Sequence, residues 1–137
     1  MIEALGVFMW WLHISSAAAL IGGMLYASAV LAPAAGGLGA EARTALAERA
    51  AAGFRRIALA AMAGLVLSGL YNILSNTGHS TRYKILLGIK LLLVAHIFSA
   101  ALTACRPHHP RRTRLLAGGA VSGFVVIAIS SYLRHIF

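Results

Sequence analysis

Three ionisable side chains lie deep inside long apolar stretches of this 137-residue chain: His13, Lys90 and His96. A central Lys or Arg in a lipid bilayer costs about 2.5–3.5 kcal/mol on insertion, and such residues usually mark ligand, ion or proton chemistry. Histidine avoids most of this penalty because its imidazole can stay neutral and then offers a lone pair to a metal. These three residues therefore form the candidate functional site.

The spacing of these side chains indicates which of them share a level. Counted at the helical rise from Leu5 and from Arg82, His13 and Lys90 both lie at a depth of about 12 Å. His96 lies about 9 Å deeper than Lys90 and points about 120° away from it around the same helix. Lys90 is expected to act as a charge partner, because a protonated ammonium has no lone pair for a metal.

Two kinds of metal site remain open at this point. Imidazoles from different helices, here His13 and His96, are able to serve as axial ligands of a haem when their second nitrogens are held by other groups. Copper is the alternative, because Cu(I) prefers thioether and imidazole ligands, and Met9 lies one helical turn before His13. A third interpretation needs no metal, since two neutral histidines can simply be hydrogen-bonded inside a bundle.

The composition indicates what kind of scaffold positions these residues. Apolar residues make up 60% of the chain and charged residues only 11%, against about 25% charged residues in a soluble domain. This excludes a cytosolic globular enzyme, a disordered chain and a disulfide-rich secreted module. The single cysteine, Cys105, has no partner for an internal disulfide. We expect a small integral membrane protein whose first partner is the lipid bilayer.

Four apolar stretches are long enough to cross a bilayer, which takes roughly 20 residues. They cover residues 5–31, 57–74, 85–104 and 115–133 of a single domain, 1–137. The first is too long for a typical signal peptide and lacks a basic segment before it, so we expect a permanent span. Short connections between the stretches predict an all-α, up-down-up-down four-helix bundle. Pro33 is expected to end the first helix, residues 40–54 to extend the second beyond the membrane, and residues 76–80 to form a turn.

The cations predict an orientation. The formal net charge is +9, and most basic residues lie in two of the three connections, where the positive-inside rule places the cytoplasm. Three basic residues lie at the opposite end, so both termini are expected on the outer side. A nucleic-acid partner is not expected, because its recognition needs a basic face on a soluble domain. The cytoplasmic set is Arg43, Arg49, Arg55, Arg56, Arg106, Arg111, Arg112 and Arg114; the outer set is Arg82, Lys84 and Arg134.

Small residues are abundant, with fourteen glycines in the chain. Gly119 and Gly123 have GxxxG spacing, which lets helix backbones approach closely in lipid. This pattern predicts close helix packing. It also leaves open a role as a cofactor-free subunit that packs into a homo-oligomer or a larger membrane complex.

Five short motifs lie in the apolar stretches and at their ends: WLH at 11–13, IGGMLY at 21–26, FRRIA at 54–58, SGLYN at 68–72 and YKILLGIKLLL at 83–93. Together they resemble the CopD family of copper-resistance membrane proteins. The resemblance covers nearly the whole chain as four helices. It implies copper uptake or homeostasis. Together with the distribution of cations, it leads us to expect a protein of a bacterial inner membrane with both termini in the periplasm.

The chain is also similar to the related HemJ-type four-helix haem proteins. In those proteins one histidine in the first helix and another in the third are associated with haem b, and these correspond to His13 and His96. The resemblance implies a redox or electron-transfer role. No paired carboxylates, phosphate-binding loop or nucleophile triad is apparent in the sequence, so any catalysis would depend on the cofactor.

Overall fold

The computed structural model describes residues 1–75, 77–78 and 80–136. Within this part of the chain the elements are α1 (Ile2–Tyr26), the π-helical η1 (Ala27–Leu31), α2 (Ala32–Ala35), α3 (Ala40–Ser75), α4 (Thr81–Ala104) and α5 (Arg112–Ile136). The predicted all-α four-helix bundle is confirmed. Of the predicted turn at 76–80, Asn76 and His79 lie outside the described residues.

Four helical segments among the described residues are long and apolar enough to cross a membrane. They are Ile2–Ala35, Ala40–Ser75, Thr81–Ala104 and Arg112–Ile136, and each encloses one of the predicted stretches. The chain thus fits an integral membrane protein. At 36 residues, α3 is about 54 Å long, well above the ~30 Å of a hydrocarbon core. This length leaves room for residues 40–54 to extend beyond the apolar layer, which stays a prediction.

The prediction that Pro33 ends the first helix is wrong. The chain stays helical to Ala35, although proline has no amide hydrogen and its ring crowds the carbonyl one turn back. The π segment η1 lies directly before this point, and the Ala32 amide bonds to the Ala27 carbonyl instead of the one four residues back. This wider turn accommodates the proline, a common role of π segments at kinks.

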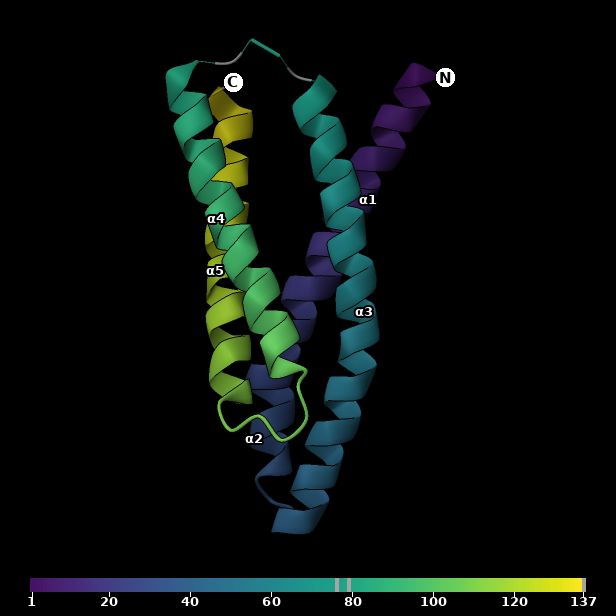
Figure 1. The fold of residues 1–137 in the computed structure, drawn as a ribbon, viewed down its shortest axis with the longest axis vertical. Helices are drawn as coiled ribbons and strands as arrows, with labels where there is room; N and C mark the ends of the chain where they lie inside the picture. Colours follow the sequence, from purple (N-terminus) through teal and green to yellow (C-terminus); the bar gives the residue numbers. More distant parts are fainter. Residues whose placement is uncertain (76, 79, 137) are drawn as a thin grey trace.

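The four long helices form two pairs. α1 packs along α3 and α4 packs along α5, while α1 also contacts α5 and joins the pairs. In Figure 1 the pairs lie close together near the end that holds α2 and the α4–α5 turn, and they spread apart toward the end that holds both termini. Both termini lie at the same end, as an up-down-up-down bundle requires.

The core between the pairs consists mostly of small side chains. Ala58, Ala101 and Ala120 are buried around Met24, which is fully covered. Gly119 and Gly123 of the GxxxG motif are also buried, and a Cβ at either position would meet α1 side chains, those of Met24 and Ile21 respectively. The motif therefore packs α5 closely on α1, in line with the general role of small residues in membrane helices.

Candidate functional site

His13 of α1 is held by a hydrogen-bonded chain that leads into α3. Its Nδ1 lies 2.9 Å from Oγ of Ser68, a residue that is completely buried. Ser68 in turn donates its hydroxyl proton to the carbonyl oxygen of Gly64, at 2.6 Å. A hydroxyl has one proton, so Ser68 Oγ accepts from Nδ1–H of His13.

This arrangement fixes the tautomer of His13. When Nδ1 carries the proton of a neutral imidazole, the lone pair is on Nε2. Metal-ligating histidines almost always have their other ring nitrogen held in this way, which sets the ring orientation and the tautomer. His13 is only partly buried in the protein, so the residue is not fully enclosed by the neighbouring helices. The imidazole therefore has the form and the support of a metal ligand.

Lys90 of α4 lies on the same side of the bundle interior. Its charge acts electrostatically on the His13 imidazole, and its side chain is half-buried on the stripe of α4 that also holds Val94, Ile97 and Ala101. His13 and Lys90 are thus within range of an electrostatic interaction, although α1 packs mainly on α3 and α4 mainly on α5. A cation in that range of a neutral imidazole suits a bound group that carries both a metal ion and a carboxylate.

His96 has a different environment. Its side chain is exposed, while the next residue, Ile97, is buried in the core at 3% exposure. His96 therefore lies off the stripe through which α4 contacts the other helices. The side chains of Lys90 and His96 are predicted to point about 120° apart around the helix. In the structure Lys90 is half-buried and His96 is exposed.

Met9 lies one helical turn before His13 on α1, and both side chains are half-buried. Their thioether and imidazole groups thus share one helix face. Across the described residues, no group of three or more His, Cys, Asp or Glu side chains is placed to hold a metal. A metal at His13 would therefore need ligands of another kind, such as a thioether or the nitrogens of a porphyrin.

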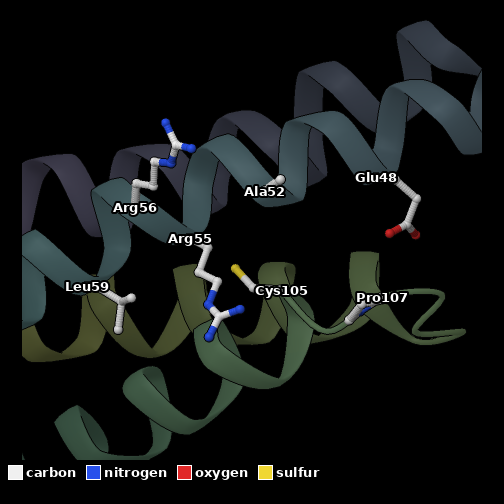
Figure 2. A pocket seen from close by; sticks show the side chains of 7 residues that line it. All are labelled: Glu48, Ala52, Arg55, Arg56, Leu59, Cys105 and Pro107. Atoms are coloured by element: carbon white, nitrogen blue, oxygen red, sulfur yellow. The ribbon is translucent and has the colours of Figure 1, made fainter.

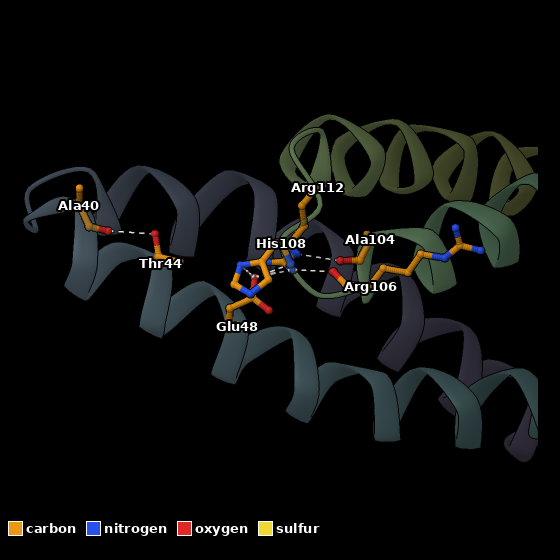
Figure 3. A network of polar contacts seen from close by, with 7 residues as sticks. All are labelled: Ala40, Thr44, Glu48, Ala104, Arg106, His108 and Arg112. Atoms are coloured by element: carbon orange, nitrogen blue, oxygen red, sulfur yellow. Dashed lines mark hydrogen bonds and ion pairs between the residues drawn. The ribbon is translucent and has the colours of Figure 1, made fainter.

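A second polar cluster, at the Arg-rich end, was not identified from the sequence. Oε1 of Glu48 on α3 accepts from the backbone N–H of His108 and from Nη2 of Arg112, both at 3.0 Å. Arg112 also donates Nε to the Ala104 carbonyl at 2.7 Å and Nη2 to the Arg106 carbonyl at 2.9 Å (Figure 3). The cluster ties the α4–α5 turn to α3. The signal in the sequence was Glu48 itself, one of three acids among many arginines.

The electrostatics of this cluster favour the carboxylate form of Glu48. The His108 N–H and the Arg112 guanidinium hold the pKa of Glu48 below its usual range. The Arg112 side chain is only 14% exposed, because it is enclosed by the turn whose carbonyls it binds. His108 has a positive φ of 55°, a conformation that costs a non-glycine residue energy. The carboxylate contact holds the turn in that conformation.

A cavity of about 380 Å³ lies next to this cluster, lined by Glu48, Ala52, Arg55, Arg56, Leu59, Cys105 and Pro107. Figure 2 shows the Arg55 side chain extending from α3 toward the end of α4 beside Cys105, whereas Arg56 points away. Burial raises the pKa of the Cys105 thiol, and the charges of Arg112 and Arg55 partly offset this.

Comparison with known proteins gives no match for this chain. No protein-family model matches it, and neither a curated protein nor a solved structure is significantly similar. The functional assignment therefore depends on the geometry described above and on the short motifs in the sequence.

Proposed function

We propose that this protein binds haem b inside the membrane through His13 and acts in electron transfer. The observation that supports this most is the His13–Ser68–Gly64 chain, which leaves the Nε2 lone pair of a neutral imidazole available. A haem supplies one-electron chemistry at its iron, with an axial histidine as one common ligand. The His13 imidazole, held by Ser68, supports binding of such a group from the α1 side.

The side chains around His13 have separate roles in this proposal. His13 binds the iron, and Ser68 orients its ring and keeps Nδ1 protonated. Lys90 is the charge partner for a propionate, because its ammonium interacts electrostatically with the His13 region and has no lone pair to offer a metal. His96, expected from the sequence as the second axial ligand, is exposed on α4. We therefore assign the principal ligand role to His13. The experiment must then decide whether His96 is a second ligand.

A copper site is the second candidate, favoured by the half-buried Met9 one turn from His13. Cu(I) takes thioether and imidazole ligands, and the resemblance to the CopD family supports uptake or homeostasis of copper. The third possibility is a cofactor-free subunit of a larger assembly. The exposed apolar side chains along the four helices suit either lipid or such a partner.

Optical spectra and metal analysis of the detergent-purified protein test these alternatives. Haem binding predicts a reduced-minus-oxidised difference spectrum of the b type, and copper binding predicts a colourless protein with stoichiometric copper. His13→Ala is expected to abolish retention of either cofactor while the helices still insert, because it removes polarity from a span. Lys90→Met is expected to weaken haem retention or shift the midpoint potential without abolishing binding.

His96→Ala is the matched control, because it removes an imidazole from an exposed position. If His96→Ala retains a haem content close to that of the unaltered protein, His13 is supported as the principal ligand. Equal loss in His13→Ala and His96→Ala would instead identify a bis-histidine haem. Full cofactor content in His13→Ala would exclude both metal sites and favour the packing subunit.

We also propose that the Arg-rich end faces the cytoplasm and that both termini are periplasmic. The support is the distribution of cations between the two ends of the bundle. In a Cys105→Ser background, a cysteine at Arg111 should be protected from an impermeant maleimide added outside, and one at Thr77 should react. The reverse pattern would invert the orientation.

A further inference from the structure

The cavity beside Cys105 has a basic side and an apolar side. Arg55 supplies a guanidinium on one side, and Ala52, Leu59 and Pro107 supply apolar surface on the other. Its volume of about 380 Å³ is within the range of small-molecule sites, roughly 300–1,000 Å³. A ligand that suits it has an anionic group next to an apolar part.

Of the two arginines in the lining, Arg55 directs its guanidinium toward Cys105, whereas Arg56 points away (Figure 2). The one carboxylate in the lining, Glu48, already accepts from Arg112 and from the His108 backbone. No hydrogen bond or ion pair to a carboxylate engages Arg55 among the described residues, although its guanidinium extends into the space between α3 and the end of α4 (Figure 2). A guanidinium in such a position is suited to bidentate contact with a phosphate.

The position of the cavity along the bundle agrees with a lipid headgroup. Arg55 and Arg56 directly precede the apolar stretch 57–74 of α3, and Cys105 and Pro107 directly follow the end of α4. Leu59 is exposed, at 47%, and lies inside that apolar stretch. The cavity therefore lies where headgroups meet acyl chains, and its apolar wall continues into the hydrocarbon layer.

From these features we propose that the cavity lined by Arg55, Leu59 and Cys105 binds the phosphate group of an anionic phospholipid, with the glycerol and upper acyl region against Leu59. Basic pockets between membrane helices bind anionic headgroups in this way. A free phosphate would use the same contact to Arg55 but would gain nothing from the apolar wall. The site is at the opposite end from His13 of α1 and does not depend on the cofactor proposed there.

Cys105 reports directly on this site, because it lines the cavity and is the only cysteine in the chain. The full-length protein in a neutral detergent is labelled with N-ethylmaleimide while short-chain phosphatidylglycerol, short-chain phosphatidylcholine or inorganic phosphate is titrated. The measured quantity is the labelling rate with the added compound divided by the rate without it. This ratio cancels any change that a variant makes to the thiol itself.

Phosphatidylglycerol is expected to slow labelling at concentrations where phosphatidylcholine does not. Arg55→Gln should raise the half-protecting concentration about fivefold, which corresponds to about 1 kcal/mol for one basic residue at a membrane surface. Arg55→Lys, which keeps the charge, should retain most of the protection. Arg49→Gln removes the same charge from an exposed position of α3 outside the cavity and should leave the concentration unchanged.

Three results would overturn the proposal. Equal protection by phosphatidylcholine would show that charge is not recognised. Protection by inorganic phosphate at lower concentrations than phosphatidylglycerol would assign the site to a soluble phosphate compound. An equal effect of the Arg55 and Arg49 variants would show a diffuse surface charge rather than a site.

Discussion

Replacing Gly123 by alanine tests how closely α5 packs on α1. A Cβ at this position would lie 2.7, 2.9 and 2.9 Å from three side-chain carbons of Ile21, closer than such atoms approach in real structures. Ile21 is buried at 7% exposure and is branched at Cβ, so it has few alternative rotamers. The helices must therefore move apart, and overpacking of this kind costs about 1–3 kcal/mol.

Gly118→Ala is the matched control on the same helix. A Cβ there meets no atom within 4 Å, so this variant gains only helix propensity, up to about 1 kcal/mol. Gly123→Ala gains the same propensity, and the difference between the two variants therefore isolates the packing cost. We expect Gly123→Ala to be less stable than Gly118→Ala by about 1–3 kcal/mol.

Gly119→Ala tests whether the packing cost depends on how rigid the neighbouring side chain is. Its Cβ would meet the terminal methyl of Met24, the far end of a flexible side chain that adapts more readily than Ile21. Its loss of stability should therefore be smaller than that of Gly123→Ala. The assay is unfolding in detergent by SDS titration, followed by circular dichroism. A Gly123→Ala protein as stable as Gly118→Ala would refute the close contact between α5 and α1.

Three further predictions concern the His13–Ser68 pair, the Glu48–Arg112 cluster and the cavity beside that cluster. Ser68→Ala removes the acceptor that fixes the His13 ring and should weaken metal or haem affinity about 10–100-fold, measured by titration of the purified apoprotein; unchanged affinity would show that the contact does not orient the ligand. Because the folded-state pKa of Glu48 is lowered, its stabilising contribution is complete above the ordinary carboxyl pKa and is lost as the pH falls through the lower pKa of the folded protein. Thermal scans should therefore show Glu48→Gln less stable than the unaltered protein at neutral pH, and this difference in stability should disappear in acid. A difference that does not depend on pH would contradict a role for the carboxylate bound to Arg112. Because burial raises the pKa of Cys105, the pH profile of its alkylation should have a midpoint above that of a free cysteine in the same detergent, and a midpoint at or below that value would contradict this environment.

The arrangement of the bundle was largely predictable from the sequence. Apolar stretches of sufficient length fixed the number and direction of the long helices, and the arginines between them marked one end. The glycine spacing at Gly119 and Gly123 indicated a close helix contact. The rule that a proline ends a helix fails at Pro33, because a local rule does not anticipate the π turn that keeps the chain helical to Ala35.

The residues of the candidate site were predictable from the sequence, but their hydrogen-bond partners were not. His13 and Lys90 stood out because ionisable groups are costly in lipid, and counting along the helices predicts a similar depth for them. The pairing of His13 with Ser68 joins residues 55 positions apart, and that of Glu48 with Arg112 joins residues 64 apart. No local pattern contains such pairings, since they depend on the register of one helix against another.

The sequence alone thus determined which segments form membrane-length helices and which polar residues lie within them. Only the tertiary structure decided which face of each helix is covered, and therefore that Lys90 faces the bundle while His96 is exposed. The physical reason is that lipid is as apolar as the protein core, so hydrophobicity does not distinguish the inner face from the outer one. Contacts of small residues, such as that of Gly123 with Ile21, determine which face is covered. These contacts exist only once the helices are packed.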